Sequence, residues 1–183
     1  MSEHRGLPGD ISKQERLERI LRVDQAGEFG ASRIYAGQLA VLGRSPSAPV
    51  IRHMAEQEDR HLETFDRLLN ERRVRPTLLS PLWHVAGFAL GAGTALLGEK
   101  AAMACTEAVE EVIDEHYARQ AGDLALDGDE EPLRETIETF RAEEIEHRDI
   151  ARQNDASGAP GYEVLTAAVK AGSRLAIWLS TRL

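Results

Sequence analysis

The chain has 183 residues, of which 42% are hydrophobic and 29% are charged, and its formal net charge is -9. This acidic balance argues against a nucleic-acid partner, because phosphate binding needs clustered Lys and Arg. The length and the hydrophobic share suffice for one sizeable core. We therefore predict one domain over residues 12–183, preceded by a short disordered N-terminus over residues 1–11.

The beginning of the chain carries no recognisable targeting signal. Its first residues, Met-Ser-Glu-His-Arg-Gly, lack both the apolar core of a signal peptide and the Arg- and Ser-rich character of a transit peptide. The single cysteine, Cys105, excludes an intramolecular disulfide and fits a reducing compartment. We therefore expect no export.

The first two predicted helices cover residues 12–42 and 49–71. Asp10 and Ser12 are candidate N-caps, and the turn between the helices reads Gly-Arg-Ser-Pro-Ser-Ala-Pro. Gly27 and Gly30 flank Glu28 inside the first helix, although each costs about 1 kcal/mol relative to alanine. They indicate either room beside Glu28 or close packing against another helix.

Residues 81–98 form an apolar stretch without a formally charged residue. As a helix it would be only ~26 Å long, and its glycines interrupt it, so it falls short of a membrane span. It suits a crossover that returns the chain along a bundle and leaves the flanking long helices parallel. One face would cover the core, and the other could enter a bilayer interface through Trp83, Phe88, Leu90 or Leu97.

Two further long helices are predicted over residues 98–126 and 131–154, separated by the turn Asp-Gly-Asp-Glu-Glu-Pro. Residues 162–183 then mix apolar residues and Trp178 with Lys170, Arg174 and Arg182, which is typical of an interfacial helix. The alternative is that this segment and residues 81–98 simply pack on the bundle or on another subunit. No strand pattern competes, so the fold class is an all-α four-helix bundle with a long crossover.

Two Glu-x-x-His pairs, Glu58/His61 and Glu144/His147, lie in the second helix of each predicted hairpin. Residues three apart share one helix face, so each pair offers a carboxylate and an imidazole to the bundle interior. Each pair lies ~25 Å from its turn, level with Glu28 in the first hairpin and with the adjacent pair Glu110/Glu111 in the second. This is the pattern of a carboxylate-bridged two-metal centre.

Coincidence explains one such pair but not their repetition. With 6 His in an acidic chain, random order would supply roughly 0.7 Glu-x-x-His matches. Yet both halves repeat the same order, because Tyr35 follows Glu28 by seven residues and Tyr117 follows Glu110 by seven. We interpret the remaining helical glutamates as solvated: Glu56, Glu63, Glu107, Glu111, Glu143 and Glu146.

The donor set restricts the choice of metal. Oxygen-rich sites that contain imidazole suit iron or manganese, and this set lacks the thiolates of structural zinc. O2 chemistry would favour iron. With Glu58 and Glu144 as bridges, each ion would keep one terminal glutamate and one histidine.

Five segments of the chain resemble stretches of a known family. They are Arg-Val-Asp-Gln-Ala-Gly-Glu-Phe-Gly-Ala (22–31), Ile-Tyr-Ala-Gly-Gln (34–38), Ala-Cys-Thr-Glu-Ala-Val-Glu-Glu (104–111), Glu-Glu-Ile-Glu-His-Arg-Asp-Ile (143–150) and Ala-Gly-Ser-Arg-Leu-Ala-Ile-Trp-Leu-Ser-Thr-Arg-Leu (171–183). These segments closely resemble the demethoxyubiquinone hydroxylase family of ubiquinone biosynthesis. The resemblance runs from about residue 16 to the C-terminus.

The resemblance implies a ferritin-like, membrane-associated di-iron monooxygenase that hydroxylates the ring of a polyprenyl demethoxybenzoquinol with O2. It selects Glu110 over Glu111, and it places His116 and Tyr117 near the substrate. All six ligand positions of the family are filled: Glu28, Glu58, His61, Glu110, Glu144 and His147.

The resemblance also sets expectations for partners and location. The reductant would be NADH, the quinol or an external donor, and a lipid-binding protein of ubiquinone biosynthesis could present the substrate. The chain lacks the presequence of mitochondrial members, so we expect a bacterial protein on the cytoplasmic face of the inner membrane. Homo-oligomerisation stays open.

Two alternatives remain at this stage. A ferroxidase or iron-handling protein would use the same bundle, but it should lack the glycine-containing apolar insertion. A membrane-bound structural protein with a vestigial centre would purify without iron.

Overall fold

The computed structural model describes residues 11–183, and this range contains α-helices and one short 3-10 helix but no strand. Asp10 and all but the last residue of the predicted disordered N-terminus lie outside the described residues. The elements are α1 (Lys13–Leu42), α2 (Ala48–Arg72), α3 (Ser80–Leu96), α4 (Glu99–Asp127), α5 (Glu131–Gln153), η1 (Ala156–Gly158) and α6 (Tyr162–Ser180).

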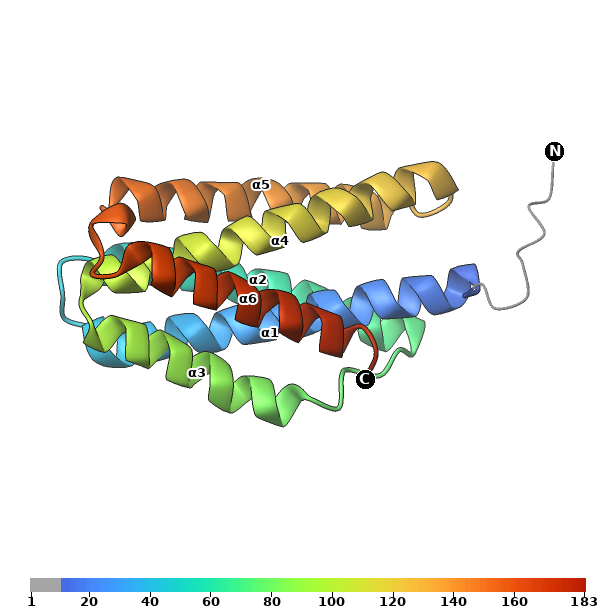
Figure 1. Cartoon of the computed structure of the whole chain (residues 1–183). Coiled ribbons are helices and arrows are strands. Elements are labelled where there is room, and N and C mark those ends of the chain that lie inside the picture. The colour runs from blue at the N-terminus through green and yellow to red at the C-terminus, as the bar shows by residue number, and fades with distance from the viewer. Residues whose placement is uncertain (1–10) are drawn as a thin grey trace.

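Helices α1, α2, α4 and α5 form a four-helix bundle, with α3 and α6 lying along its outside (Figure 1). The pairs α1/α2 and α4/α5 are antiparallel hairpins. Helix α3 carries the chain back along α1 between them, so that α2 and α4 run in the same direction (Figure 1). The predicted ferritin-like bundle with a crossover is therefore confirmed.

The helices end where the sequence predicts, because the turn residues supply caps. The Ser12 side chain accepts a hydrogen bond from the Glu15 backbone N–H at 3.1 Å, which caps α1. Proline occupies the first turn of α2 and of α5, where no backbone donor is needed. Gly128 ends α4 with φ 70°, in the left-handed region that glycine enters freely.

Gly87 and Gly91 of α3 serve packing and do not interrupt the helix, which corrects the sequence-based interpretation of that segment. Helix α3 is continuous over 17 residues. A Cβ on Gly91 would overlap the backbone oxygen of Ile34, and a Cβ on Gly37 would overlap that of Phe88. The absence of these methyl groups lets α1 and α3 approach closely.

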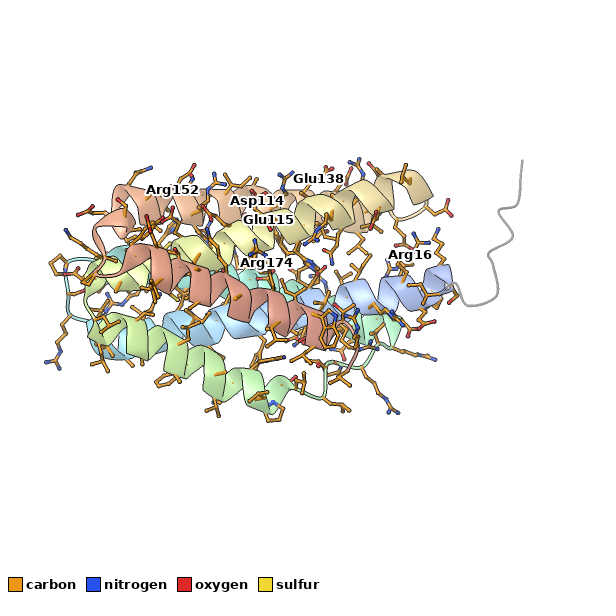
Figure 2. All side chains as sticks on the ribbon, viewed as in Figure 1. Arg16, Asp114, Glu115, Glu138, Arg152 and Arg174 are labelled. Atoms are coloured by element: carbon orange, nitrogen blue, oxygen red, sulfur yellow. The ribbon has the colours of Figure 1, made fainter. Side chains whose placement is uncertain are left out.

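Ion pairs join α6 to the bundle. Arg174 on α6 lies 3.1 Å from Glu115 on α4, and Figure 2 labels both side chains.

Glu107 on α4 accepts hydrogen bonds from Arg152 on α5 at 2.7 Å and from the hydroxyl of Tyr162 at 2.8 Å. Glu107 is buried, so its predicted solvation is wrong, and its partners explain how the carboxylate is tolerated.

Two apolar clusters fill the bundle on either side of its middle. One includes Leu21, Phe65 and Ile137 near the N-terminal end of α1. The other includes Ile51 and Met54 near the turn between α1 and α2. The middle layer between them therefore lies deep in the protein and away from bulk water.

None of the helices in residues 11–183 combines the length and the apolar character needed to cross a membrane.

Candidate metal centre

All six sequence-predicted ligands meet in the middle layer of the bundle, and each is at most 4% exposed. They contribute to two groups of potential metal-binding residues, in each of which the donor atoms lie within 4.8 Å of one another. One group contains Glu28 and His61, and the other contains Glu110 and His147. Glu58 and Glu144 belong to both groups, which is the arrangement expected of bridging carboxylates.

Both histidines turn Nδ1 toward these carboxylates. His61 Nδ1 lies 3.0 Å from Oε1 of Glu144 and 3.5 Å from Oε2 of Glu28. His147 Nδ1 lies 3.1 Å from Oε1 of Glu58 and 3.1 Å from Oε2 of Glu144. Helical spacing of three residues, repeated on α2 and α5, produces this convergence.

The chemistry of the buried atoms fits divalent cations. Both carboxylate oxygens of Glu58 and one oxygen of Glu110 are buried without a hydrogen-bond partner. Burying carboxylates without partners is costly, and a pair of cations would satisfy them. The donors are carboxylate oxygen and imidazole nitrogen, which suits iron or manganese.

The electrostatics of the centre lead to the same conclusion. Burial raises the pKa of Glu28, Glu58 and Glu110 above their ordinary value, and the nearby Glu144 adds to the effect. Burial also acts to raise the pKa of Glu144, but hydrogen bonds with His147 and His61 outweigh it and bring this pKa to about 2. Burial therefore favours the neutral form of Glu28, Glu58 and Glu110 when no cation is bound.

His61 takes part in this proton balance. Burial acts to lower the pKa of His61, yet hydrogen bonds with Glu144 and Glu28 raise it to about 11. A metal ion at Nδ1 would displace that proton, because only the deprotonated nitrogen is a ligand.

A tyrosine from the opposite hairpin holds each terminal glutamate. The Tyr35 hydroxyl on α1 donates to Oε1 of Glu110 on α4 at 3.0 Å. The Tyr117 hydroxyl on α4 donates to Oε1 of Glu28 on α1. Burial raises the pKa of both tyrosines well above the ordinary value, so they remain neutral donors. Each tyrosine that follows a ligand glutamate by seven residues in the sequence thus binds the corresponding glutamate of the other hairpin.

His116 lies apart from Tyr117, although the two are adjacent in the chain. The His116 side chain is 14% exposed, and its Nε2 lies 3.3 Å from Oδ1 of Asp24. Gln120 completes this group by donating to the same Asp24 oxygen at 2.7 Å. The structure therefore places Tyr117 at the centre, and it places His116 in a neighbouring polar group with Asp24 and Gln120, both of which are buried.

Sequence reasoning missed two residues that contact the ligand histidines. Gln57 Oε1 lies 3.0 Å from Nε2 of His147, and Glu143 Oε2 lies 2.9 Å from Nε2 of His61. The Glu143 side chain is 29% exposed, so its predicted solvation holds only in part. One signal was available in the sequence, because each of these residues directly precedes the glutamate of a Glu-x-x-His pair.

An apolar cavity of about 340 Å³ lies among α1, α3, α4 and α6. Two residues of its wall, Gly27 and Val109, directly precede the ligands Glu28 and Glu110. One residue along a helix is a step of about 100° around its axis, so α1 and α4 present the ligands on one side and the cavity wall on another.

Gly30 lines the same cavity, and a Cβ there would meet nothing within 4 Å. At Gly30, the sequence left open whether the glycine provides room or close packing, and the structure shows room. Close packing at this point depends on Gly87 of α3, since a Cβ there would lie 2.8 Å from the Gly30 backbone oxygen.

Comparison with known proteins assigns the chain to a family. The family model described as "Ubiquinone biosynthesis protein COQ7" matches residues 15–180. The chain belongs to the COQ7 family. The match spans all six elements that build the bundle, the crossover and the C-terminal helix.

Relatives of this COQ7-family chain carry consistent names. It is 64% identical to a "3-demethoxyubiquinol 3-hydroxylase" of Rhodospirillum rubrum, with 96% of this chain and 82% of the relative covered. It is 54% identical to the human "NADPH-dependent 3-demethoxyubiquinone 3-hydroxylase, mitochondrial", with 97% and 83% covered. For the yeast "5-demethoxyubiquinone hydroxylase, mitochondrial", identity is 48%, with 91% and 78% covered.

Proposed function

We propose that the chain is an O2-dependent monooxygenase that hydroxylates the ring of a polyprenyl demethoxybenzoquinol in ubiquinone biosynthesis. The observation that carries the proposal is the buried set of four glutamates and two histidines in a chain of the COQ7 family. The names of the relatives support both the substrate class and the reaction.

Two iron ions are the proposed cofactor. Glu28 and His61 would hold one ion, Glu110 and His147 would hold the other, and Glu58 and Glu144 would bridge them, as their membership of both groups suggests. When bound, the iron pair would activate O2, one atom of which enters the ring.

The apolar cavity among α1, α3, α4 and α6 is the proposed substrate site. Its volume of about 340 Å³ lies within the range of small-molecule pockets. Its apolar wall suits a hydrophobic quinol and excludes water from the reacting ring, and the polyprenyl tail would run along α3. Gly27 and Gly30 leave room for the ring beside the helix that carries Glu28.

The remaining chemistry requires protons and electrons from outside the centre. Hydroxylation inserts one oxygen atom of O2 and reduces the other to water, which consumes two electrons and two protons. The electrons would come from a nicotinamide nucleotide, from the quinol or from another donor; the human relative is named as NADPH-dependent. Tyr35 and Tyr117 keep the two terminal glutamates oriented during turnover.

Peripheral membrane association is part of the proposal, because the substrate is a membrane lipid. Exposed apolar side chains occur along α3 and α6, where Val85 is 64% exposed and Leu175 is 56% exposed. Trp83 and Leu90 line the cavity between these helices, and Leu175 lies at the same cavity. Docking of this face on the cytoplasmic side of a bacterial inner membrane would open the cavity toward the lipid.

An isotope experiment tests the function. Protein loaded anaerobically with Fe(II) is given a demethoxyquinol, a reductant and ¹⁸O2, and the product is analysed by mass spectrometry. We expect one ¹⁸O atom in the new hydroxyl group. Product oxygen derived from water, or equal turnover by metal-free protein, would refute the proposal. Rapid oxidation of Fe(II) that accumulates ferric mineral without product would favour the ferroxidase alternative.

A further inference from the structure

Each ligand histidine is contacted at Nε2, the nitrogen that faces away from the carboxylate cluster, by a side chain of the other hairpin. Gln57 on α2 lies against His147 on α5, and Glu143 on α5 lies against His61 on α2. In each case the contact is made to Nε2, while Nδ1 faces the carboxylate cluster. A hydrogen-bond acceptor at Nε2 keeps the proton there and leaves Nδ1 available as a metal ligand.

Gln57 and Glu143, the two supports of the ligand histidines, are connected to each other. Gln57 Nε2 lies 3.3 Å from Oε2 of Glu143, which also accepts the hydrogen bond from His61. Gln57 can therefore accept from His147 only through Oε1 while it donates to Glu143 through Nε2, which fixes the orientation of its amide. The guanidinium of Arg60 lies 3.6 Å from the same Glu143 oxygen, at the surface end of the chain of contacts.

The two supports differ in charge although they occupy equivalent positions. A carboxylate that accepts from a ligand histidine makes the imidazole a stronger donor, and an uncharged amide does so less. We infer that Gln57 and Glu143 are positioning residues that make the two metal positions unequal, with tighter binding beside His61 than beside His147. This inference rests on the two-metal centre of the proposed function.

Titration of the metal-free protein with Co(II) tests the inequality, because Co(II) reports on its ligands by visible absorption. We expect two equivalents to bind with different dissociation constants. Glu143→Gln preserves the shape but removes the charge, so it should weaken the tighter site about 10-fold and bring the two constants together. Gln57→Leu removes the acceptor of His147, so it should weaken the other site about 10-fold or more and move the constants apart.

The absorption spectrum identifies the position that each variant affects. The first equivalent of Co(II) should change its spectrum in Glu143→Gln, and the second should change in Gln57→Leu. The exchange variant Gln57→Glu/Glu143→Gln should restore unequal binding, because it moves the carboxylate behind the other histidine. A residue that served only to stabilise the fold would not be rescued in this way.

Glu146→Gln is the matched control, since Glu146 is an exposed glutamate one turn from Glu143 on the same helix. It should leave both constants unchanged, and circular dichroism should show the same helical content in every metal-free variant. The inference is overturned if both single variants move the ratio of the constants in the same direction, or if neither moves it. Wild-type protein that binds no Co(II) would overturn the two-metal centre as well, and wild-type titration separates the two failures.

Discussion

Glu58 and Glu144 are the residues on which the proposed centre depends most, because each belongs to both groups of potential metal ligands. Their surroundings differ when no metal is bound. Burial raises the pKa of Glu58, whereas the two histidines hold the pKa of Glu144 at about 2. The surroundings of Glu144 therefore favour its ionised form, and those of Glu58 do not.

Replacing Glu144 or His147 by alanine should abolish hydroxylation and lower metal affinity by more than about 100-fold, since each change removes a ligand rather than an outer support. Metal content by elemental analysis and product by mass spectrometry are the two measurements. The exposed Glu146→Ala on the same helix should keep both. Full activity in His147→Ala would show that the ligand assignment is wrong.

The proton balance of the centre predicts a pH dependence with a definite sign. In the metal-free fold, the pKa values of Glu28, Glu58 and Glu110 lie above 4.5, and that of His61 rises from 6.5 to about 11. A group whose pKa is raised by folding stabilises the folded state while the group is protonated. The contribution of the three glutamates to stability therefore begins to decline above pH 4.5, and the contribution of His61 begins to decline above pH 6.5. Glu144, with its lowered pKa, acts oppositely but only below 4.5.

Metal-free protein should therefore lose thermal stability between about pH 6 and about pH 9, while cation binding strengthens over the same range as protons are released. Melting temperatures with and without Co(II) at several pH values measure both effects. The difference between the two curves should widen as pH rises. A difference that narrows toward high pH would contradict the pKa shifts on which the prediction depends.

For single residues, the sequence predicts the six metal ligands but not the side chains that hold those ligands in place. Spacing along an amphipathic helix identifies Glu58/His61 and Glu144/His147, because residues three apart must share a face. Contacts such as Tyr35 to Glu110 join different hairpins, and their pairing depends on how the hairpins cross. Glu107 was misjudged for the same reason, since its burial depends on Arg152 and Tyr162 from other helices.

Among the elements, α3 shows how composition can mislead. Its glycines are poor helix formers, yet the helix is continuous because close packing against α1 compensates for them. The bounds of the four bundle helices α1, α2, α4 and α5 were predictable to within about two residues, because Gly, Pro and Ser mark the turns. The side of α1 on which α3 packs was not predictable, because it depends on surface shape rather than on periodicity.

Two neighbouring glycines of α3 should respond oppositely to alanine. Gly91→Ala places a methyl group on the backbone oxygen of Ile34 and should cost about 1–3 kcal/mol of unfolding free energy. Gly93→Ala meets nothing within 4 Å, so it should gain up to about 1 kcal/mol through helix propensity. Urea denaturation of the metal-free protein measures both. Equal effects of the two substitutions would show that α3 does not pack on α1 through Gly91.

At the scale of the whole molecule, the bundle separates two tasks. The six buried Glu and His side chains of the proposed metal centre lie in the middle layer between two apolar clusters, where bulk water does not reach them. The cavity lies on the outer side of α1 and α4, covered by α3 and α6. One pair of helices thus presents ligands inward and a hydrophobic site outward.

The exposed apolar side chains of α3 and α6, which include Leu82, Val85 and Leu175, lead us to predict membrane binding. Changing Leu82, Val85 and Leu175 together to glutamine should reduce flotation with anionic liposomes several-fold, because each removes apolar area from the proposed contact. Leu126→Gln is a suitable control, since Leu126 is 88% exposed and lies at the C-terminal end of α4, outside α3 and α6. Undiminished flotation of the triple variant would refute the proposed membrane face.

The most direct test of the two-metal centre is a crystal structure of the protein loaded anaerobically with Fe(II), with data collected at the iron absorption edge. We predict two anomalous peaks about 3.5–4 Å apart, one beside Glu28 and His61 and one beside Glu110 and His147, with Glu58 and Glu144 between them. A single peak, or iron bound only outside this cluster, would contradict the account.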